Sequence, residues 1–163
     1  MAIAISLLAL LATLYELHLQ RIHNRKSLRP IAQIDVFDRK KLMYVHVQNS
    51  GVGPLIVDRL SFIKDGKRYV DIEDCLDLNP KTYMHMQITD AVIKVITPGS
   101  HLEVFSTKFD DHEGETEMAA VRSKLAAIRL KVEGRDIYDS KIVVERDLQW
   151  FERHKFRDDE IAP

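Results

Sequence analysis

The first fifteen residues form an apolar stretch with no charged side chain and only three polar ones. Continued through residue 20 as a helix, this stretch would be about 30 Å long, which matches the hydrocarbon core of a bilayer. Its apolar residues surround the helix instead of forming one stripe, which disfavours a core helix of a soluble protein. The pattern predicts a transmembrane and juxtamembrane helix over residues 1–24, followed by a folded domain over residues 25–163.

A different pattern begins after residue 30, where short runs rich in β-branched residues partly alternate between apolar and polar positions. Runs 31–37 and 42–49 flank a charged turn, and runs 54–63 and 68–72 flank a turn that contains Asp65 and Gly66. Alternation of this kind around a short turn is typical of antiparallel hairpins. Two hairpins are therefore expected in the first half of the domain.

The second half continues this strand-rich pattern around one helix. Acidic residues followed by apolar residues at helical spacing predict a helix over 115–127. The remaining strand-like runs lie at 83–88, 91–96, 101–109, 128–133 and 140–148. Roughly seven to nine short strands in one domain predict a β-sandwich. Trp150 and Phe151 follow the last run and are expected to pack in the core, with a place at the membrane surface as the alternative.

The residues that follow the apolar stretch set its expected orientation. They include four basic residues close together, namely Arg21, Arg25, Lys26 and Arg29. Basic residues stay on the cytoplasmic side, so we expect a retained single-pass anchor in a bacterial inner membrane, with the N-terminus outside and the body in the cytoplasm. Each basic side chain at the headgroups contributes about 1 kcal/mol. The single cysteine, Cys75, also fits a reducing compartment.

One face of the apolar helix carries small and polar side chains instead of large ones. This face consists of Ala2, Ser6, Ala9, Thr13, Glu16 and Gln20. Small residues let helix backbones approach in lipid, and polar residues pair across the contact, so we expect this face to pack on another transmembrane protein or on a second copy of the chain. For Glu16 the simpler alternative is that its carboxylate reaches the headgroups.

The charge balance of the body argues against nucleic acid as a partner. All 24 basic residues lie at or after Arg21, and of the 25 acidic residues only Glu16 lies before it. The body is therefore formally neutral, whereas a phosphate-binding surface needs clustered basic residues without matching acids. Membrane lipid is the partner that the four basic residues after the apolar stretch favour.

The segment NSGVGP is predicted to form a structural turn at a corner of the sandwich. Asn49 is expected to hydrogen-bond the local backbone, Gly51 and Gly53 to take positive φ, and Pro54 to open an edge strand. A phosphate-binding loop is disfavoured because no helix with a Lys and a Ser or Thr follows Gly53.

Two acidic segments are the nearest candidates for a metal site. Residues 110–117 contain five acids and His112, and a second group consists of Asp71, Glu73, Asp74 and Asp77. Neither has the spacing of a calcium loop, and acids before a helix are favoured by its dipole, so both are expected to be solvated structural segments. No catalytic residue, metal ligand or cofactor is assigned from these patterns.

Three segments carry a resemblance to known proteins: RIHNRKSLRP at 21–30, VQNSGVGPLIV at 47–57 and DLQWFERH at 147–154. In these segments the chain resembles small uncharacterised bacterial proteins with one N-terminal transmembrane helix and an immunoglobulin-like β-sandwich. The resemblance implies architecture and location, and it implies no catalytic residues. The expected fold class is thus mainly β: an N-terminal transmembrane helix followed by an immunoglobulin-like antiparallel β-sandwich with one interior helix.

These observations favour a non-enzymatic function. We expect a membrane-anchored protein-interaction or scaffold module that faces the cytoplasm and belongs to a larger membrane-associated assembly. Two alternatives stay open at this point. The first is an extracytoplasmic ligand-binding sandwich, and the second is a metal-dependent regulator or enzyme that uses the acids at 110–117.

Overall fold

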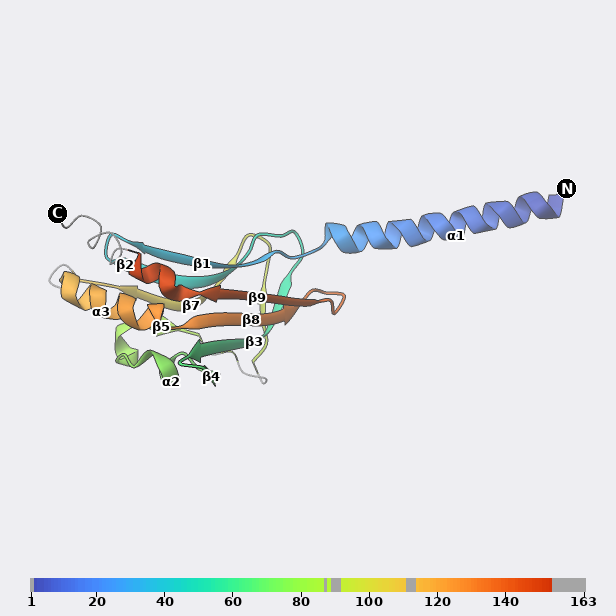
Figure 1. Ribbon diagram of the computed structural model, residues 1–163. Coiled ribbons are helices and arrows are strands. Elements are labelled where there is room, and N and C mark those ends of the chain that lie inside the picture. Colours follow the sequence, from blue (N-terminus) through green and yellow to red (C-terminus); the bar gives the residue numbers. More distant parts are fainter. Residues whose placement is uncertain (1, 87, 89–91, 111–113, 154–163) are drawn as a thin grey trace, which may run out of the picture.

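The structure is a computed structural model that describes residues 2–86, 88, 92–110 and 114–153. One long helix is followed by two antiparallel sheets and a few short helices (Figure 1). The expectation of a mainly β chain, with an N-terminal apolar helix and a domain consistent with a β-sandwich, is therefore confirmed.

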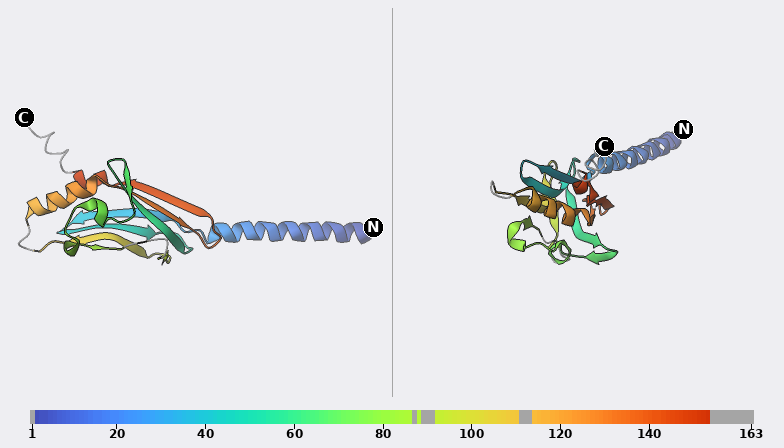
Figure 2. Two further views of the ribbon diagram at one scale, coloured as in Figure 1. Left: turned by 90° about the horizontal axis from the view of Figure 1, so that it is seen from below. Right: turned by 60° about the vertical axis from the view of Figure 1, so that its left-hand side comes forward.

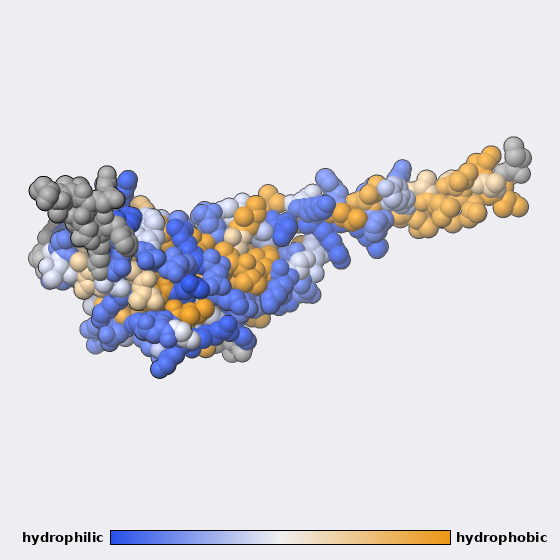
Figure 3. All heavy atoms as spheres, viewed as in Figure 1, coloured by the Kyte–Doolittle hydropathy of each residue, from blue (hydrophilic) through white to orange (hydrophobic). Residues whose placement is uncertain are grey.

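Helix α1 (Ala2–Ser27) buries none of its residues and projects from one end of the body (Figures 1 and 2). It is long and apolar enough to span a membrane. Its 26 residues rise about 39 Å as one continuous helix. Figure 3 shows apolar side chains along its outer part and hydrophilic ones where it approaches the body.

Sheet A contains four strands in the order β1-β2-β7-β5. Their bounds are Ala32–Arg39 for β1, Leu42–Asn49 for β2, His101–Lys108 for β7 and Met84–His85 for β5. The expected first hairpin is confirmed as β1 and β2, which pair in register from Ala32 opposite Asn49 to Arg39 opposite Leu42. Lys40 and Lys41 form its two-residue turn, both with positive φ.

Sheet B is built around strand β3 (Leu55–Lys64), which pairs with β8 on one side and with β4 and β6 on the other. The bounds of its other strands are Lys67–Tyr69 for β4, Lys94–Ile96 for β6, Arg129–Arg135 for β8 and Lys141–Asp147 for β9. The second expected hairpin is confirmed as β3 and β4, and both Asp65 and Gly66 take positive φ in its turn.

The core lies between the two sheets and is filled largely by alternate residues of β1, β2, β7 and β8. Strand β2 shows this best, because Met43, Val45 and Val47 are buried and the residues between them are only partly buried. A bulge between β2 and β7 brings the consecutive residues Val104 and Phe105 into the interior. At the open edge, the Arg146 guanidinium of β9 donates to the Ile34 carbonyl of β1 at 2.6 Å and joins the two sheets.

The expected interior helix is confirmed as α3 (Glu115–Ala126), which leads from sheet A to sheet B. The structure corrects other expectations. A four-residue helix, α2 (Glu73–Leu76), follows a strand β4 that ends at Tyr69 instead of at residue 72. The runs 83–88 and 91–96 supply only the short strands β5 and β6, and residues 87 and 89–91 lie outside the described residues.

Two 3-10 turns complete the fold: η1 (Pro80–Thr82) and η2 (Leu148–Glu152). The η2 turn lies beside α3 at the end of the body opposite α1 (Figures 1 and 2). Phe151 is fully buried there and Trp150 packs against the core. The prediction that these residues pack in the core is confirmed, and the alternative at the membrane surface is not supported.

Candidate functional site

The junction between α1 and the body is organised by the buried side-chain amide of Asn49. Its Nδ2 donates to the Gly53 and Ile96 carbonyls at 2.7 and 3.0 Å. Its Oδ1 accepts from the backbone N–H groups of Ile31 and Gly51 at 3.2 and 3.1 Å. Four hydrogen bonds therefore tie the segment after α1, the β2–β3 loop and the end of β6 to one buried group.

The two glycines of this loop are needed for a different reason from the one expected. Neither is among the glycines with positive φ. A Cβ on Gly53 would lie 1.7 Å from the Leu28 carbonyl oxygen, and one on Gly51 would lie 2.4 Å from the Ile31 nitrogen. Only glycine lets the loop pack directly against the chain that leaves α1. The expectation for Pro54 is also corrected, because β3, which follows it, is an inner strand and not an edge strand.

The residues predicted to contact the membrane lie on the exposed surface of α1 or just after it. Ser6 and Thr13 donate to the carbonyls of Ala2 and Ala9 within the helix, so their hydroxyls are satisfied without a partner helix. Ala2, Ser6, Ala9, Thr13, Glu16 and Gln20 are all exposed, as are Arg21, Arg25, Lys26 and Arg29. The packing role of the first group and the lipid-binding role of the second stay predictions.

Outside residues 111–113, which the structure does not describe, the acids at 110–117 have structural contacts. Glu115 pairs with Arg122 in the same helix. The Glu117 carboxylate accepts from the Gly114 N–H at 2.9 Å, which caps the start of α3. The Asp110 backbone carbonyl accepts from Lys41 at 2.8 Å. These contacts agree with a structural segment before a helix.

A group of possible metal ligands combines two acids of the second acidic segment with a histidine from strand β5. Asp71, Glu73 and His85 each offer one ligand atom, and these atoms lie within 4.8 Å of one another. His85 Nε2 is 3.0 Å from Glu73 Oε1, and Asp71 accepts from the Glu73 N–H. The contact between His85 and Glu73 and the turn at Asp71 account for this geometry without a cation. Asp71 and Glu73 belong to the second acidic segment, but the sequence does not associate them with His85, because His85 lies on a separate strand.

Cys75, which lies nearby, has a thiol of low reactivity. Burial raises the pKa of the Cys75 thiol to about 11, and Asp74 and Asp71 raise it further against the opposing effect of Lys64. A thiol with such a pKa is almost entirely protonated at neutral pH and is a poor nucleophile. Burial is the main cause of this raised pKa.

The outer face of sheet A carries a row of four stacked rings, here called the ring ladder: Phe37, Tyr44, His46 and His101. Successive ring centroids are 4.9, 3.9 and 4.2 Å apart, and the interplanar angles are 5°, 9° and 12°. The rings come from β1, β2 and β7. They line up because Phe37 lies directly opposite Tyr44, and alternate residues of β2 point to the same side.

Two carboxylates border the ring ladder. The Tyr44 hydroxyl donates to Asp35 at 3.4 Å, and His46 Nε2 lies 3.6 Å from Glu103. Burial, helped by the neighbouring His101, lowers the pKa of His46 despite the opposing effect of Glu103. His46 is therefore neutral at neutral pH, as a stacked imidazole in a row of rings should be. The ladder presents a partly exposed surface of stacked aromatic rings bordered by two carboxylates.

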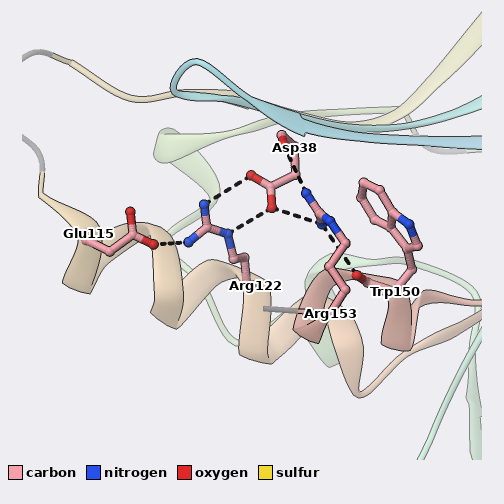
Figure 4. Close-up of polar contacts among 5 residues, drawn as sticks. All are labelled: Asp38, Glu115, Arg122, Trp150 and Arg153. Carbon is pink, nitrogen blue, oxygen red and sulfur yellow. Dashed lines mark hydrogen bonds and ion pairs between the residues drawn. The ribbon is translucent and has the colours of Figure 1, made fainter. Parts of the chain in front are cut away.

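A second polar cluster lies at the end of the body opposite α1 and is here called the Asp38 clasp (Figure 4). The Asp38 carboxylate, with 4% of its side chain exposed, accepts from Arg122 at 2.9 and 3.2 Å and pairs with Arg153 at 3.2 Å. Arg153 also donates to the Asp38 backbone carbonyl, and its guanidinium stacks on the Trp150 ring at 3.6 Å.

The Asp38 clasp connects three segments that are distant in sequence: the β1–β2 hairpin, α3 and η2 (Figure 4). Its ionised groups are paired with one another, and Glu115 binds the remaining edge of Arg122. Removing one member of such a buried cluster destabilises a fold, because it leaves a buried charge without its partner. We interpret the clasp as a structural lock on the far end of the sandwich.

Comparison with known proteins adds no name to these features. No protein-family model matches the chain, and no curated protein matches its sequence.

Proposed function

We propose that the protein is a membrane-anchored, non-enzymatic interaction subunit of a larger membrane assembly. Helix α1 would lie in a bacterial inner membrane with its N-terminus outside, and the body would face the cytoplasm. The basic residues that end α1, Arg25 and Lys26, support this orientation because positive charge is retained on the cytoplasmic side. The resemblance to small bacterial single-span proteins with an immunoglobulin-like sandwich is part of the same proposal.

The ring ladder is the observation that carries the interaction function. Aromatic side chains are enriched in protein interfaces because they bury a large area while losing few rotamers. Here four rings stand in one row on a single sheet face, already stacked, so little order would be lost when a partner covers them. Asp35 and Glu103 at its border would favour a partner surface that carries basic side chains.

Photocrosslinking in intact cells tests the ladder as the binding face. Benzoylphenylalanine replaces Phe37 in one variant and Val143, an exposed residue of β9 in sheet B, in a matched control. The proposal predicts a discrete protein adduct from position 37 and none from position 143. Equal adducts from both positions, or no adduct from position 37, would contradict it.

Reporter fusions test the orientation separately. Fluorescent protein fused to the C-terminus should fold and fluoresce, whereas alkaline phosphatase at the same place should stay inactive. The reverse pattern would support the alternative of an extracytoplasmic ligand-binding sandwich.

A further inference from the structure

Five exposed apolar side chains surround the point where α1 joins the body. They belong to three segments: the linker after α1, the β2–β3 loop and the β8–β9 turn. The set, here called the apolar collar, consists of Leu28, Ile31, Val52, Ile137 and Tyr138, with exposed fractions of 40%, 58%, 65%, 47% and 37%. Apolar side chains gathered from three segments at one end of a domain indicate a contact surface.

The β8–β9 turn holds its two collar residues in a fixed position. The buried Asp136 carboxylate accepts from the backbone N–H groups of Tyr138 and Ser140, both at 2.8 Å. Asp139 takes positive φ and its carboxylate binds Arg135 at 2.6 Å. Ile137 and Tyr138 are therefore presented outward by an ordered turn, and their exposure is a property of the fold.

The other collar residues are equally fixed relative to α1. Val52 lies between Gly51 and Gly53, whose backbones pack against the linker at Leu28 and Ile31. The Ser50 N–H also donates to the Ile31 carbonyl at 2.9 Å. The β2–β3 loop is thus packed directly against the linker that follows α1.

The position of the β8–β9 turn along α1 places this part of the collar at the lipid headgroups. If the hydrocarbon core ends near Gln20, Arg25 lies about 8 Å beyond it, and the headgroup layer is roughly 5–8 Å thick on each side. The Arg25 guanidinium lies 5.4 Å from the centre of the Tyr138 ring. Tyr138 also shares a surface hollow with His18 and Arg21, which are closer to the core. The β8–β9 turn therefore extends to the height of the headgroups.

The charge around the collar fits an anionic lipid surface. Arg21, Arg25, Lys26 and Arg29 are exposed at the same end of the body. The two acids of the β8–β9 turn are engaged within the protein, Asp136 by backbone N–H groups and Asp139 by Arg135. Apolar and aromatic side chains among basic ones are typical of segments that lie in a membrane interface.

We propose that the apolar collar is a second membrane contact, whose β8–β9 turn, with Ile137 and Tyr138, inserts into the headgroup layer of the bilayer that α1 spans. The proposal rests on the membrane anchoring proposed above. In Figures 1 and 2 the long strands run roughly along the direction of α1. A collar fixed in the headgroups would hold the body upright, so that the ring ladder faces sideways toward neighbouring membrane proteins and the Asp38 clasp points away from the membrane.

Site-specific fluorescence on the full-length chain tests this contact. Ile137→Cys and the control Val143→Cys are labelled with the environment-sensitive dye NBD. The native Cys75 is buried with a raised pKa, so labelling at neutral pH selects the introduced thiol. The labelled proteins are placed in nanodiscs of equal parts phosphatidylcholine and phosphatidylglycerol that contain a headgroup spin-labelled lipid. Co-elution with the nanodisc reports anchoring by α1 independently.

The proposal predicts several-fold quenching of the dye at position 137 by the spin-labelled lipid and little quenching at position 143. In nanodiscs of phosphatidylcholine alone, the quenching at position 137 should decrease because the basic residues lose their anionic partners. A dye at position 137 that is quenched only by a water-soluble spin probe overturns the collar contact, even if co-elution shows that α1 is inserted. A dye shielded from both probes means that protein covers the collar, which overturns lipid as the occupant.

Discussion

The two ends of the body are held together by different interactions. At the end nearest α1, neutral hydrogen bonds and close backbone packing join the segments. At the opposite end, a buried carboxylate between two arginines joins them. The near end depends on Asn49 and on glycines that let two backbones touch. The far end depends on Asp38 and its ion pairs. The near end should therefore be sensitive to added volume, and the far end to a lost charge.

The largest effect is expected from Asp38→Ala. The substitution leaves two partly buried guanidinium groups without their carboxylate, and breaking a buried ion pair in this way costs about 3–5 kcal/mol of the free energy of unfolding. Urea unfolding of the full-length chain in detergent measures it. Glu145→Ala removes the exposed ion pair with Arg129 and should cost only about 0–1 kcal/mol. Equal losses for the two variants would show that the clasp is not a structural lock.

Gly53→Ala should have the next largest effect. The new Cβ would meet the Leu28 carbonyl oxygen, so the loop and the linker must separate, at a cost of about 1–3 kcal/mol or more. The same unfolding experiment measures this loss, with Ser50→Ala as the control, for which a change within about 0.5 kcal/mol is expected. A fully tolerated Gly53→Ala would contradict the close packing of loop and linker.

Association through α1 is expected to be weaker in energy. Replacing Ala9 and Thr13 with Leu adds bulk to the predicted packing face and should weaken self-association or partner binding by about 1 kcal/mol. Analytical ultracentrifugation in detergent measures the effect on self-association. Leu11→Ala changes the opposite face and is the matched control. An unchanged association state in the double variant would contradict the prediction that this face packs on another helix.

The smallest effect is expected from acidification around the ring ladder. Because the folded protein holds the pKa of His46 below its ordinary value of 6.5, the unfolded chain binds this proton more readily. Stability from this residue is therefore complete above about pH 6.5 and is lost as the pH falls below that value. Unfolding measured on either side of about pH 6.5 should show the loss, and His46→Phe should reduce it. An identical pH dependence in His46→Phe would contradict the assignment.

The features that the sequence predicted are those with local causes. The apolar length of α1, the charged turn between residues 37 and 42, the turn at Asp65–Gly66, and the acidic start of α3 each depend on neighbouring residues alone. Such signals need no knowledge of the rest of the fold.

The features that could not be predicted from the sequence depend on contacts between distant segments. The run 83–88 looks like a strand, but Tyr83 and Ile88 are both buried and only Met84 and His85 pair with β7. The ring ladder requires the register of three strands, and the Asp38 clasp requires two helical segments that return to the β1–β2 hairpin. The glycines at 51 and 53 were recognised as structural, but the sequence does not show which backbone passes beside them.

The central claim is that α1 is embedded in a lipid bilayer and holds the body at its surface. Alkaline carbonate extraction of membranes from cells that make the full-length chain tests it most directly, because this treatment releases peripheral proteins and retains spanning ones. If α1 spans the bilayer, the protein stays in the membrane pellet. Its release into the supernatant as a monodisperse protein would contradict the anchor, and with it the proposals that depend on the membrane.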